Sequence, residues 1–168
     1  AWMEYGRVLL DCGSPEEAEN AFNQAKADRS LRDDAFLGLA AALSKQNKTQ
    51  DAIKTLRKAL TNNPQLIEAW FNLAQEMAAI ENWEETVRIA SRAHYLAPND
   101  LDVFMLLANG LINVNRPQEA KDLFEKLRWP KILPPEFYGT LAEIFKLCGE
   151  ETRAVDCLIE ACANYPES

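Results

Sequence analysis

The chain has 168 residues, of which 48% are hydrophobic and 26% charged, a composition typical of a soluble folded protein with a sizeable core. Its 26 acidic and 18 basic residues give a net charge of −8, which repels a phosphate backbone, so nucleic acid is not an expected partner. No stretch approaches the roughly 20 uninterrupted apolar residues of a membrane helix, so membrane insertion is not expected either.

A period of 34 residues runs through the chain, and each period opens with an aromatic residue. Apolar residues follow three and seven positions later, and a small residue follows four positions later. These offsets place all four positions on one face of an α-helix. The aromatic column is Trp2, Phe36, Trp70, Phe104 and Tyr138; the next columns are Tyr5, Leu39, Leu73, Leu107 and Leu141, then Gly6, Ala40, Ala74, Ala108 and Ala142, then Leu9, Leu43, Met77, Leu111 and Phe145.

The second half of each period predicts another helix, with small residues in one column and larger apolar residues in the column four positions later. A turn column separates the two halves, and its Gly and Asn residues tolerate the left-handed conformation that ends a helix. At Glu81, which departs from this pattern, we expect the neighbouring Asn82 to take that role. Residues Ser14 to Glu17 predict an N-cap, a helix-initiating proline and a capping-box acid. The small column is Ala18, Ala52, Thr86, Ala120 and Ala154, the apolar column Phe22, Leu56, Ala90, Phe124 and Leu158, and the turn column Gly13, Asn47, Glu81, Asn115 and Gly149.

The pattern as a whole predicts an all-α fold. Pro64, Pro98 and Pro166 close three of the periods, because proline cannot continue a helix. Ten helices are expected, over residues 1–12, 15–28, 33–46, 49–62, 67–80, 83–96, 101–114, 117–128, 135–148 and 151–164.

The unit resembles the tetratricopeptide repeat, whose pattern is W-x2-L-G-x2-Y, then A-x3-F, then P. The resemblance covers the whole chain and divides it into one array of five repeats, over approximately residues 1–32, 33–66, 67–100, 101–134 and 135–168. It implies a right-handed superhelical α-solenoid of five antiparallel helix pairs. The first helix of each pair would line a concave groove that binds a polypeptide segment, so the resemblance implies a protein–protein interaction scaffold and not an enzyme.

Two features depart from a regular array. No polar capping helix follows the fifth repeat, so we expect the chain to be a segment of a longer protein. Pro130 predicts that the second helix of repeat four ends a turn early and that the angle between repeats four and five is altered. Trp129 either fills the resulting gap or meets a partner.

Catalytic and metal-binding patterns are absent from the sequence. It contains no P-loop, no GxGxxG and no GxSxG, and its only histidine is His94. Its four cysteines, at positions 12, 148, 157 and 162, form no CxxC pair. We therefore expect no catalytic residues, no metal and no cofactor. The apparently unpaired thiols favour a reducing, cytoplasmic compartment.

The candidate peptide-binding surface lies one, five and eight positions after the aromatic residues. By the family resemblance, this second face of the first helices lines the groove, where it would form an apolar strip with amides beside it. The alternative is that the residues one position after each aromatic only pack between adjacent first helices. The candidates are Met3, Arg7, Leu37, Phe71, Gln75, Met105, Asn109 and Ile112.

An acidic residue stands two positions before the aromatic in repeats two to five. It either stabilises the N-terminus of its helix or forms an acidic groove edge for a basic ligand. These residues are Asp34, Glu68, Asp102 and Glu136.

The expected partner is a protein or peptide that is apolar with basic residues. Some tetratricopeptide co-chaperones bind acidic chaperone tails through a clamp of lysine, asparagine and arginine. Here Glu68, Asp102 and Glu136 stand where a lysine is needed, so an acidic chaperone tail is not an expected partner. Two alternatives stay open: a structural module that forms homo-oligomers by stacking through uncapped terminal repeats, and a regulatory arm of an enzyme whose catalytic domain lies outside this sequence.

Overall fold

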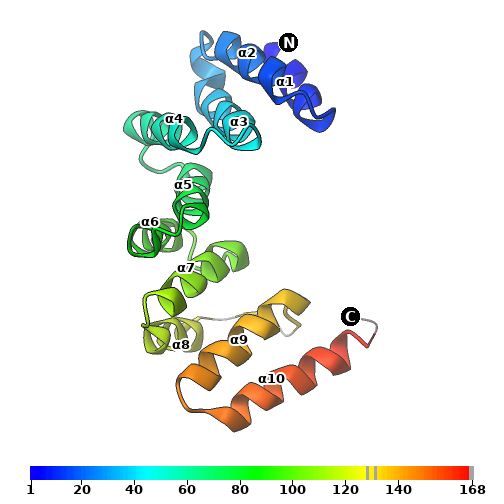
Figure 1. Cartoon of the computed structure of the whole chain (residues 1–168), viewed down its shortest axis with the longest axis vertical. Helices are drawn as coiled ribbons and strands as arrows, with labels where there is room; N and C mark the ends of the chain where they lie inside the picture. The colour runs from blue at the N-terminus through cyan, green and yellow to red at the C-terminus, as the bar shows by residue number, and fades with distance from the viewer. Residues whose placement is uncertain (128, 131, 167–168) are drawn as a thin grey trace. The chain divides into compact units, whose positions relative to one another are not determined.

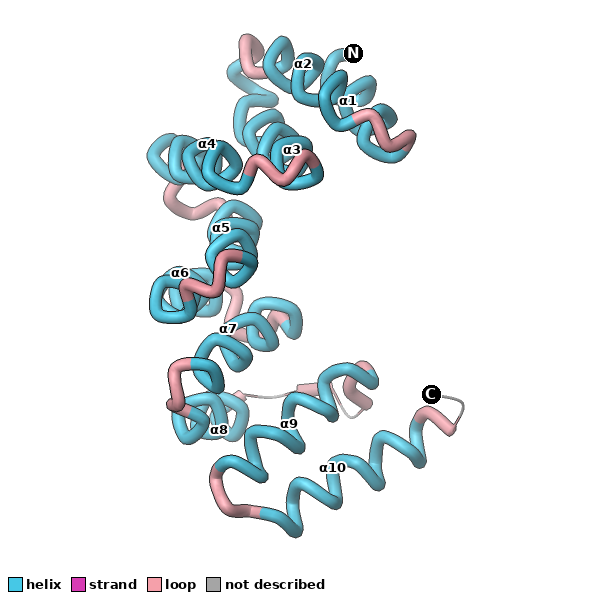
Figure 2. The backbone as a smooth tube through the Cα atoms, in the orientation of Figure 1, coloured by secondary structure: helices cyan, strands magenta, loops and turns pink. Residues whose placement is uncertain are grey.

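The computed structural model describes residues 1–127, 129–130 and 132–166. Within these ranges the chain forms ten α-helices, one short 3-10 helix and no strand, which confirms the predicted all-α fold. Short loops connect the two helices of each consecutive pair, as between α1 and α2 or between α9 and α10 (Figures 1 and 2). The elements are α1 (Trp2–Asp11), α2 (Pro15–Ala25), η1 (Arg29–Leu31), α3 (Arg32–Lys45), α4 (Thr49–Asn62), α5 (Ile67–Ala79), α6 (Trp83–Leu96), α7 (Leu101–Asn113), α8 (Pro117–Lys126), α9 (Pro135–Leu147) and α10 (Glu151–Asn164).

The chain divides into two compact units, Ala1–Glu81 and Asn82–Ser168. In the first unit each helix from α1 to α4 packs on the helix that follows it, and α1 also meets α3. In the second unit each helix from α6 to α9 packs on its successor, and α7 also meets α9. This neighbour-to-neighbour packing is that of a solenoid of helix pairs. The right-handed superhelix and the five repeat boundaries stay predictions.

The periodic columns supply the buried side chains of both units. In the first unit Phe22 of α2 is completely buried, and it belongs to one core with Leu39 and Ala42 of α3. In the second unit Phe104 of α7 and Tyr138 of α9 are buried at the aromatic position of their repeats. Burial of the periodic apolar columns therefore holds successive helices together.

The turn column adopts the predicted left-handed conformation in all five repeats. Gly13 and Gly149 have φ of +75° and +78°, and Asn47 and Asn115 have φ of 59°. The expectation for Asn82 was wrong: Glu81 itself has φ of 57°, and Asn82 has φ of −84°. The turn geometry thus follows the position in the repeat even where the residue there is neither Gly nor Asn.

The predicted cap of α2 forms only in part. Ser14 is the N-cap residue and Pro15 the first helical residue, as expected, but the Ser14 side chain accepts no capping hydrogen bond. The Ser14 backbone N–H instead donates to the carbonyl of Leu9 at 2.8 Å, which closes the end of α1. The capping-box expectation was therefore wrong, because the turn between the two helices is held by the backbone.

Two second helices end earlier than the pattern predicted. Helix α2 stops at Ala25, because the Asp28 carboxylate accepts hydrogen bonds from the backbone N–H and the hydroxyl of Ser30, at 2.9 and 2.7 Å, and starts η1. Helix α8 has 10 residues, ending at Lys126, whereas α4, α6 and α10 have 14 each. The early end of α8 agrees with the effect expected of Pro130; Arg128, the predicted last residue, lies outside the described residues.

Trp129 packs inside the second unit, which decides between its two interpretations. Its ring centroid lies 5.0 Å from that of Phe104 and 5.5 Å from that of Phe137, and it stacks on Phe124 at 5.9 Å. Its indole N–H donates to the Phe124 carbonyl at 2.9 Å. The aromatic ring therefore fills space beyond the shortened α8.

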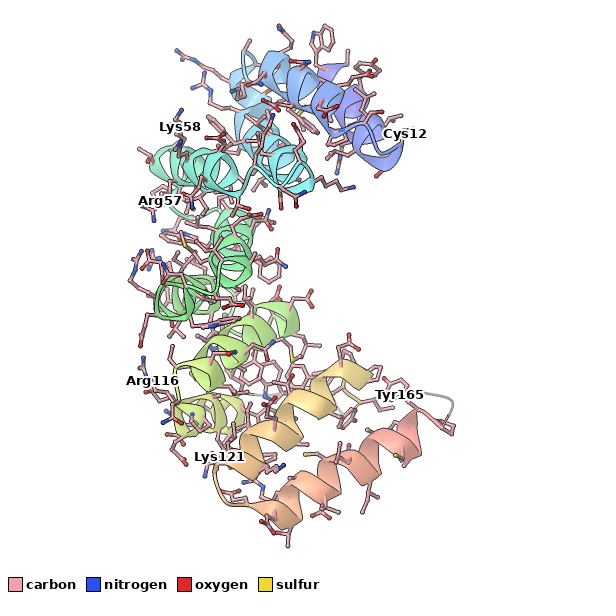
Figure 3. The ribbon with its side chains drawn as sticks, viewed as in Figure 1. Cys12, Arg57, Lys58, Arg116, Lys121 and Tyr165 are labelled. Atoms are coloured by element: carbon pink, nitrogen blue, oxygen red, sulfur yellow. The ribbon has the colours of Figure 1, made fainter. Side chains whose placement is uncertain are left out.

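An ion pair joins α8 to the turn that precedes α10. The Lys121 ammonium (labelled in Figure 3) lies 2.6 Å from Glu150 Oε1, and Glu150 also lies 2.7 Å from Arg153 Nη1. Arg153 in turn lies 2.7 Å from Glu125 and stacks its guanidinium on Phe145, 4.0 Å from the ring centroid. These contacts lower the pKa of the Glu150 carboxyl, first through the Lys121 hydrogen bond and then through Arg153.

Candidate peptide-binding surface

The first unit contains a hollow of about 340 Å³ built by α1, α2, α3 and α5. Four of the residues that the sequence analysis singled out line it together: Met3 and Arg7 of α1, and Asp34 and Leu37 of α3. Met3 is buried, Leu37 is half-buried, and Arg7 and Asp34 are exposed at the rim. The periodic offsets therefore identified one side of a real concavity.

The hollow continues into a second one of about 240 Å³ between α3 and α5. Ala41 and Asn72 line both hollows, and Gln75 lines the second. Within the described part of the chain, the side-chain amides of Asn72 and Gln75 have no hydrogen-bond partner. They are therefore free to bond the main chain of a ligand.

Phe22 forms the floor of the first hollow, and two glycines make room for its ring. A Cβ atom built on Gly38 would lie 2.4 Å from Phe22 Cε1, and one built on Gly6 would lie 2.8 Å from the same atom. Any larger side chain at Gly38 would therefore displace the Phe22 ring from its place under the hollow. The shape of the surface therefore depends on two residues that carry no side chain.

Opposite charges flank the hollow at its rim. Arg7 forms an ion pair with Glu4 one turn earlier, at 3.6 Å, and both side chains are largely exposed. An exposed pair of this kind contributes little to stability, so Arg7 can exchange Glu4 for a ligand group at small cost. Lys45 donates to the Leu10 carbonyl at 3.2 Å and is thereby fixed between α1 and α3.

The other predicted residues are distributed over both units. Phe71 of α5 is half-buried, as are Met105 and Ile112 of α7, whereas Asn109 is exposed. Three acids of the proposed edge, Glu68, Asp102 and Glu136, are exposed like Asp34. Met3 is buried, which agrees with packing between first helices at this repeat, and the ligand-binding role of the column stays a prediction.

Sequence reasoning missed part of the lining. Phe22 was assigned to the core alone, although it is also the floor of the hollow. Gly38 and Asn72 were not among the candidates, although each lines the hollow, whereas Leu10 and Ala41 lie in it at the predicted offsets of eight and five residues. Gly38 carried a usable signal, because a glycine in the middle of a predicted helix often marks a close approach of another group.

Among the described residues, no three His, Cys, Asp or Glu side chains lie in a metal-binding cluster. His94 is buried in α6, its Nδ1 has no hydrogen-bond partner, and burial lowers its pKa. All four cysteines are free thiols, and burial raises the pKa of Cys157 and of Cys148. Among the described helices, none has the length and apolar character needed to cross a bilayer.

Comparisons with known proteins agree with the helical repeat. Residues 33–76 match the family model described as Tetratricopeptide repeat. Among solved structures, the crystal structure of MamA is similar over 96% of this chain and 95% of its own, with 18% sequence identity and a TM-score of 0.82. No curated protein matches the sequence.

Two further solved structures share the fold at low identity. A tetratricopeptide repeat protein from Parabacteroides merdae is similar over 99% of this chain and 66% of its own, with 16% identity and a TM-score of 0.84. TTC0263, a tetratricopeptide repeat protein of Thermus thermophilus, is similar over 99% of this chain and 91% of its own, with 16% identity and a TM-score of 0.70. At these identities the likeness is one of fold.

Proposed function

Because this chain is a tetratricopeptide-repeat protein, we propose that it is a non-catalytic scaffold that binds a polypeptide segment along its first helices. Proteins with this fold generally mediate protein–protein interactions. The observation that carries the proposal is the hollow of the first unit, where residues of three successive first helices, α1, α3 and α5, meet around an apolar floor.

The chemistry of the hollow points to the kind of segment it would hold. Leu37, Leu10 and Ala41 offer apolar contact to a side chain of the ligand, and interface energy concentrates in a few such anchors. The free amides of Asn72 and Gln75 would bond its main chain. An extended or helical segment with one or two apolar anchors therefore fits this surface.

The exposed acidic residues near the hollow predict that the proposed ligand is basic. Asp34 stands at the rim of the hollow, and Glu68 is exposed two residues before Trp70 on α5. Basic residues beside the apolar anchor would meet these carboxylates. The second unit carries candidates of the same kinds, which would have the same preference on their own surface: Met105, Asn109, Ile112, Asp102 and Glu136.

The test begins with a display library of random short peptides selected against the immobilised chain. Selected peptides are expected to carry an apolar anchor flanked by lysine or arginine. Leu37→Glu should weaken their binding at least tenfold, about 1.4 kcal/mol, because it places a charge on the apolar wall of the hollow. Fluorescence anisotropy of labelled peptides measures the dissociation constants.

The matched control is Leu147→Glu, the same substitution at an exposed leucine of α9 outside the hollow. It should leave the dissociation constants unchanged. If the two variants bind the selected peptides equally well, the hollow is not the binding surface. If selection yields only acidic peptides, the proposed charge preference is wrong.

A further inference from the structure

A further hollow, of about 250 Å³, lies in the second unit among α8, α9 and α10. Its floor is apolar and aromatic, because Leu133, Tyr138 and Phe145 line it and are at most 7% exposed. Phe124 of α8 and Cys157 of α10 are half-buried on its walls. None of the candidate residues from the sequence analysis lines this hollow, so it is a surface of its own.

Two carboxylates stand at the mouth of this hollow. Asp156 and Glu160 are exposed one turn apart on α10, and both line the hollow. Glu160 Oε1 accepts a hydrogen bond from the Tyr138 hydroxyl at 3.3 Å, and the Asn164 amide donates to that hydroxyl at 3.0 Å. The Glu160 side chain is thereby held beside the aromatic floor. Asp156 forms no ion pair and no hydrogen bond with any other residue that the structure describes.

The repeat itself does not require acidic residues at these two positions. The second helices of repeats two and three carry two basic residues there, and that of repeat four carries one acidic and one basic residue. The acidic pair of α10 is therefore a property of the fifth repeat, where the hollow lies. The equivalent pairs are Lys54 and Lys58 in α4, Arg88 and Arg92 in α6, and Asp122 and Lys126 in α8.

One guanidinium group is already bound beside this floor, by a residue of the chain itself. The Arg153 guanidinium lies 4.0 Å from the ring centroid of Phe145, and its Nη1 atom lies 2.7 Å from carboxylate oxygens of both Glu125 and Glu150. An aromatic face attracts a cation, and charge-assisted hydrogen bonds to carboxylates hold it in place. Because Arg153 is taken up by its own two carboxylates, the two at the mouth are left for another cation.

We propose that this hollow binds an arginine side chain of a polypeptide partner. The methylene stem of the arginine lies against Phe124 and Tyr138, and its guanidinium group meets Asp156 and Glu160. Long basic side chains bury their stems on apolar surface in this way while the charged end stays near water. Arginine is favoured over lysine, because a planar guanidinium can stack on a ring and bond two carboxylates at once. The proposal does not depend on the function proposed for the first unit.

Nuclear magnetic resonance titration of the whole ¹⁵N-labelled chain tests the proposal. The probe is a capped pentapeptide with one arginine between glycines, and its controls carry lysine or glutamine in place of the arginine. The arginine peptide should shift the amide signals of Asp156, Cys157 and Glu160 with saturation in the millimolar range. The lysine peptide should bind at least threefold more weakly, and the glutamine peptide should cause no saturable shift. Absence of a saturable shift with the arginine peptide overturns the proposal, and equal binding of the lysine peptide refutes the preference for arginine.

Matched charge variants separate binding in the hollow from attraction to an acidic protein. Asp156→Asn combined with Glu160→Gln should weaken binding of the arginine peptide at least fivefold. Glu143→Gln combined with Glu151→Gln removes two charges from exposed positions of the same unit outside the hollow, and should leave the dissociation constant unchanged. All four side chains are exposed, so the fold should survive, and circular dichroism checks this. Equal loss of binding in the two double variants overturns the proposal.

A second substitution tests the hollow without changing its charge. Cys157→Phe fills the space between α8 and α10 and leaves both carboxylates in place, so it should also weaken binding at least fivefold. Unchanged binding in a folded Cys157→Phe chain would place the arginine on the exposed surface of α10 and contradict the proposed site.

Discussion

Gly38→Ala tests the close packing under the hollow of the first unit, and Gly139→Ala is its matched control. Both glycines lie inside first helices, where replacing glycine by alanine stabilises a helix by about 1 kcal/mol. At Gly139 nothing lies within 4 Å of the new Cβ atom, so that gain should appear undiminished. The gain in helix stability from replacing glycine by alanine is common to both substitutions, so it cancels when their free energies of unfolding are compared.

The structure gives the size of that difference. The Cβ atom at Gly38 would lie 2.4 Å from Phe22 Cε1, whereas ordinary contact begins at 3.4 Å, so the ring must retreat by about 1 Å. Phe22 is completely buried, and Gly6 also lies against its ring, with a built Cβ atom 2.8 Å from the same ring carbon. Overpacking of this kind costs about 1–3 kcal/mol. Gly38→Ala should therefore have a free energy of unfolding about 1–3 kcal/mol below that of Gly139→Ala.

Urea denaturation followed by far-ultraviolet circular dichroism measures both variants against the unmodified chain. A second variant, Gly38→Ala combined with Phe22→Leu, should cost less than the two single substitutions added together, because the smaller side chain makes room for the new methyl group. If Gly38→Ala and Gly139→Ala stabilise the chain equally, the reasoning about Phe22 is refuted.

Three other predictions concern the turn column, the buried histidine and the partner. Glu81→Gly should raise the free energy of unfolding by about 1 kcal/mol, because it removes the strain of a left-handed residue that has a side chain. Gly13→Ala should lower the free energy of unfolding by a similar amount. Urea denaturation measures both, and a loss for Glu81→Gly or a gain for Gly13→Ala would contradict the strain argument. Burial lowers the pKa of His94 below 6.5, so the unfolded chain takes up the proton first and the free energy of unfolding falls as the pH drops below about 6.5. In His94→Leu, the urea midpoint should therefore fall less between pH 7.5 and pH 5.5 than it does in the unmodified chain. An equal fall in both chains would rule out this histidine as the cause. An acidic chaperone tail peptide should show no binding in calorimetry, and micromolar binding would contradict the charge reasoning at Glu68.

The period of the sequence was enough to predict the helices and their facing sides. Burial of columns such as Phe104 and Leu107 follows directly from the 34-residue spacing, because a helix that recurs in register must meet its neighbour in the same way each time. The ends of α2 and α8 were less predictable. They depend on a local turn at Asp28 and Ser30 and on the segment around Trp129, which interrupt the periodic pattern.

The candidate site was predictable only on one of its walls. Offsets along a helix identify residues on the same face, so Met3, Arg7 and Leu37 were found. The Phe22 side chain of α2 fits between the first helices because Gly6 and Gly38 carry no side chains. The spacing of residues along a single helix does not predict this contact between helices. The turn at Glu81 is a similar case, since the backbone imposes a conformation that the residue itself disfavours.

The packing of Trp129 also gives the chain an internal spectroscopic reporter. Its indole stacks on Phe124 with 10° between the ring planes, whereas Trp2 is half exposed in the first repeat. Indoles in apolar surroundings emit at shorter wavelengths than indoles in water. The chain has four tryptophans, so a variant that keeps Trp129 and lacks Trp2, Trp70 and Trp83 should report the junction of repeats four and five by emission at a short wavelength. Loss of the fifth repeat should shift the emission of that variant toward longer wavelengths, because it exposes Trp129 to water.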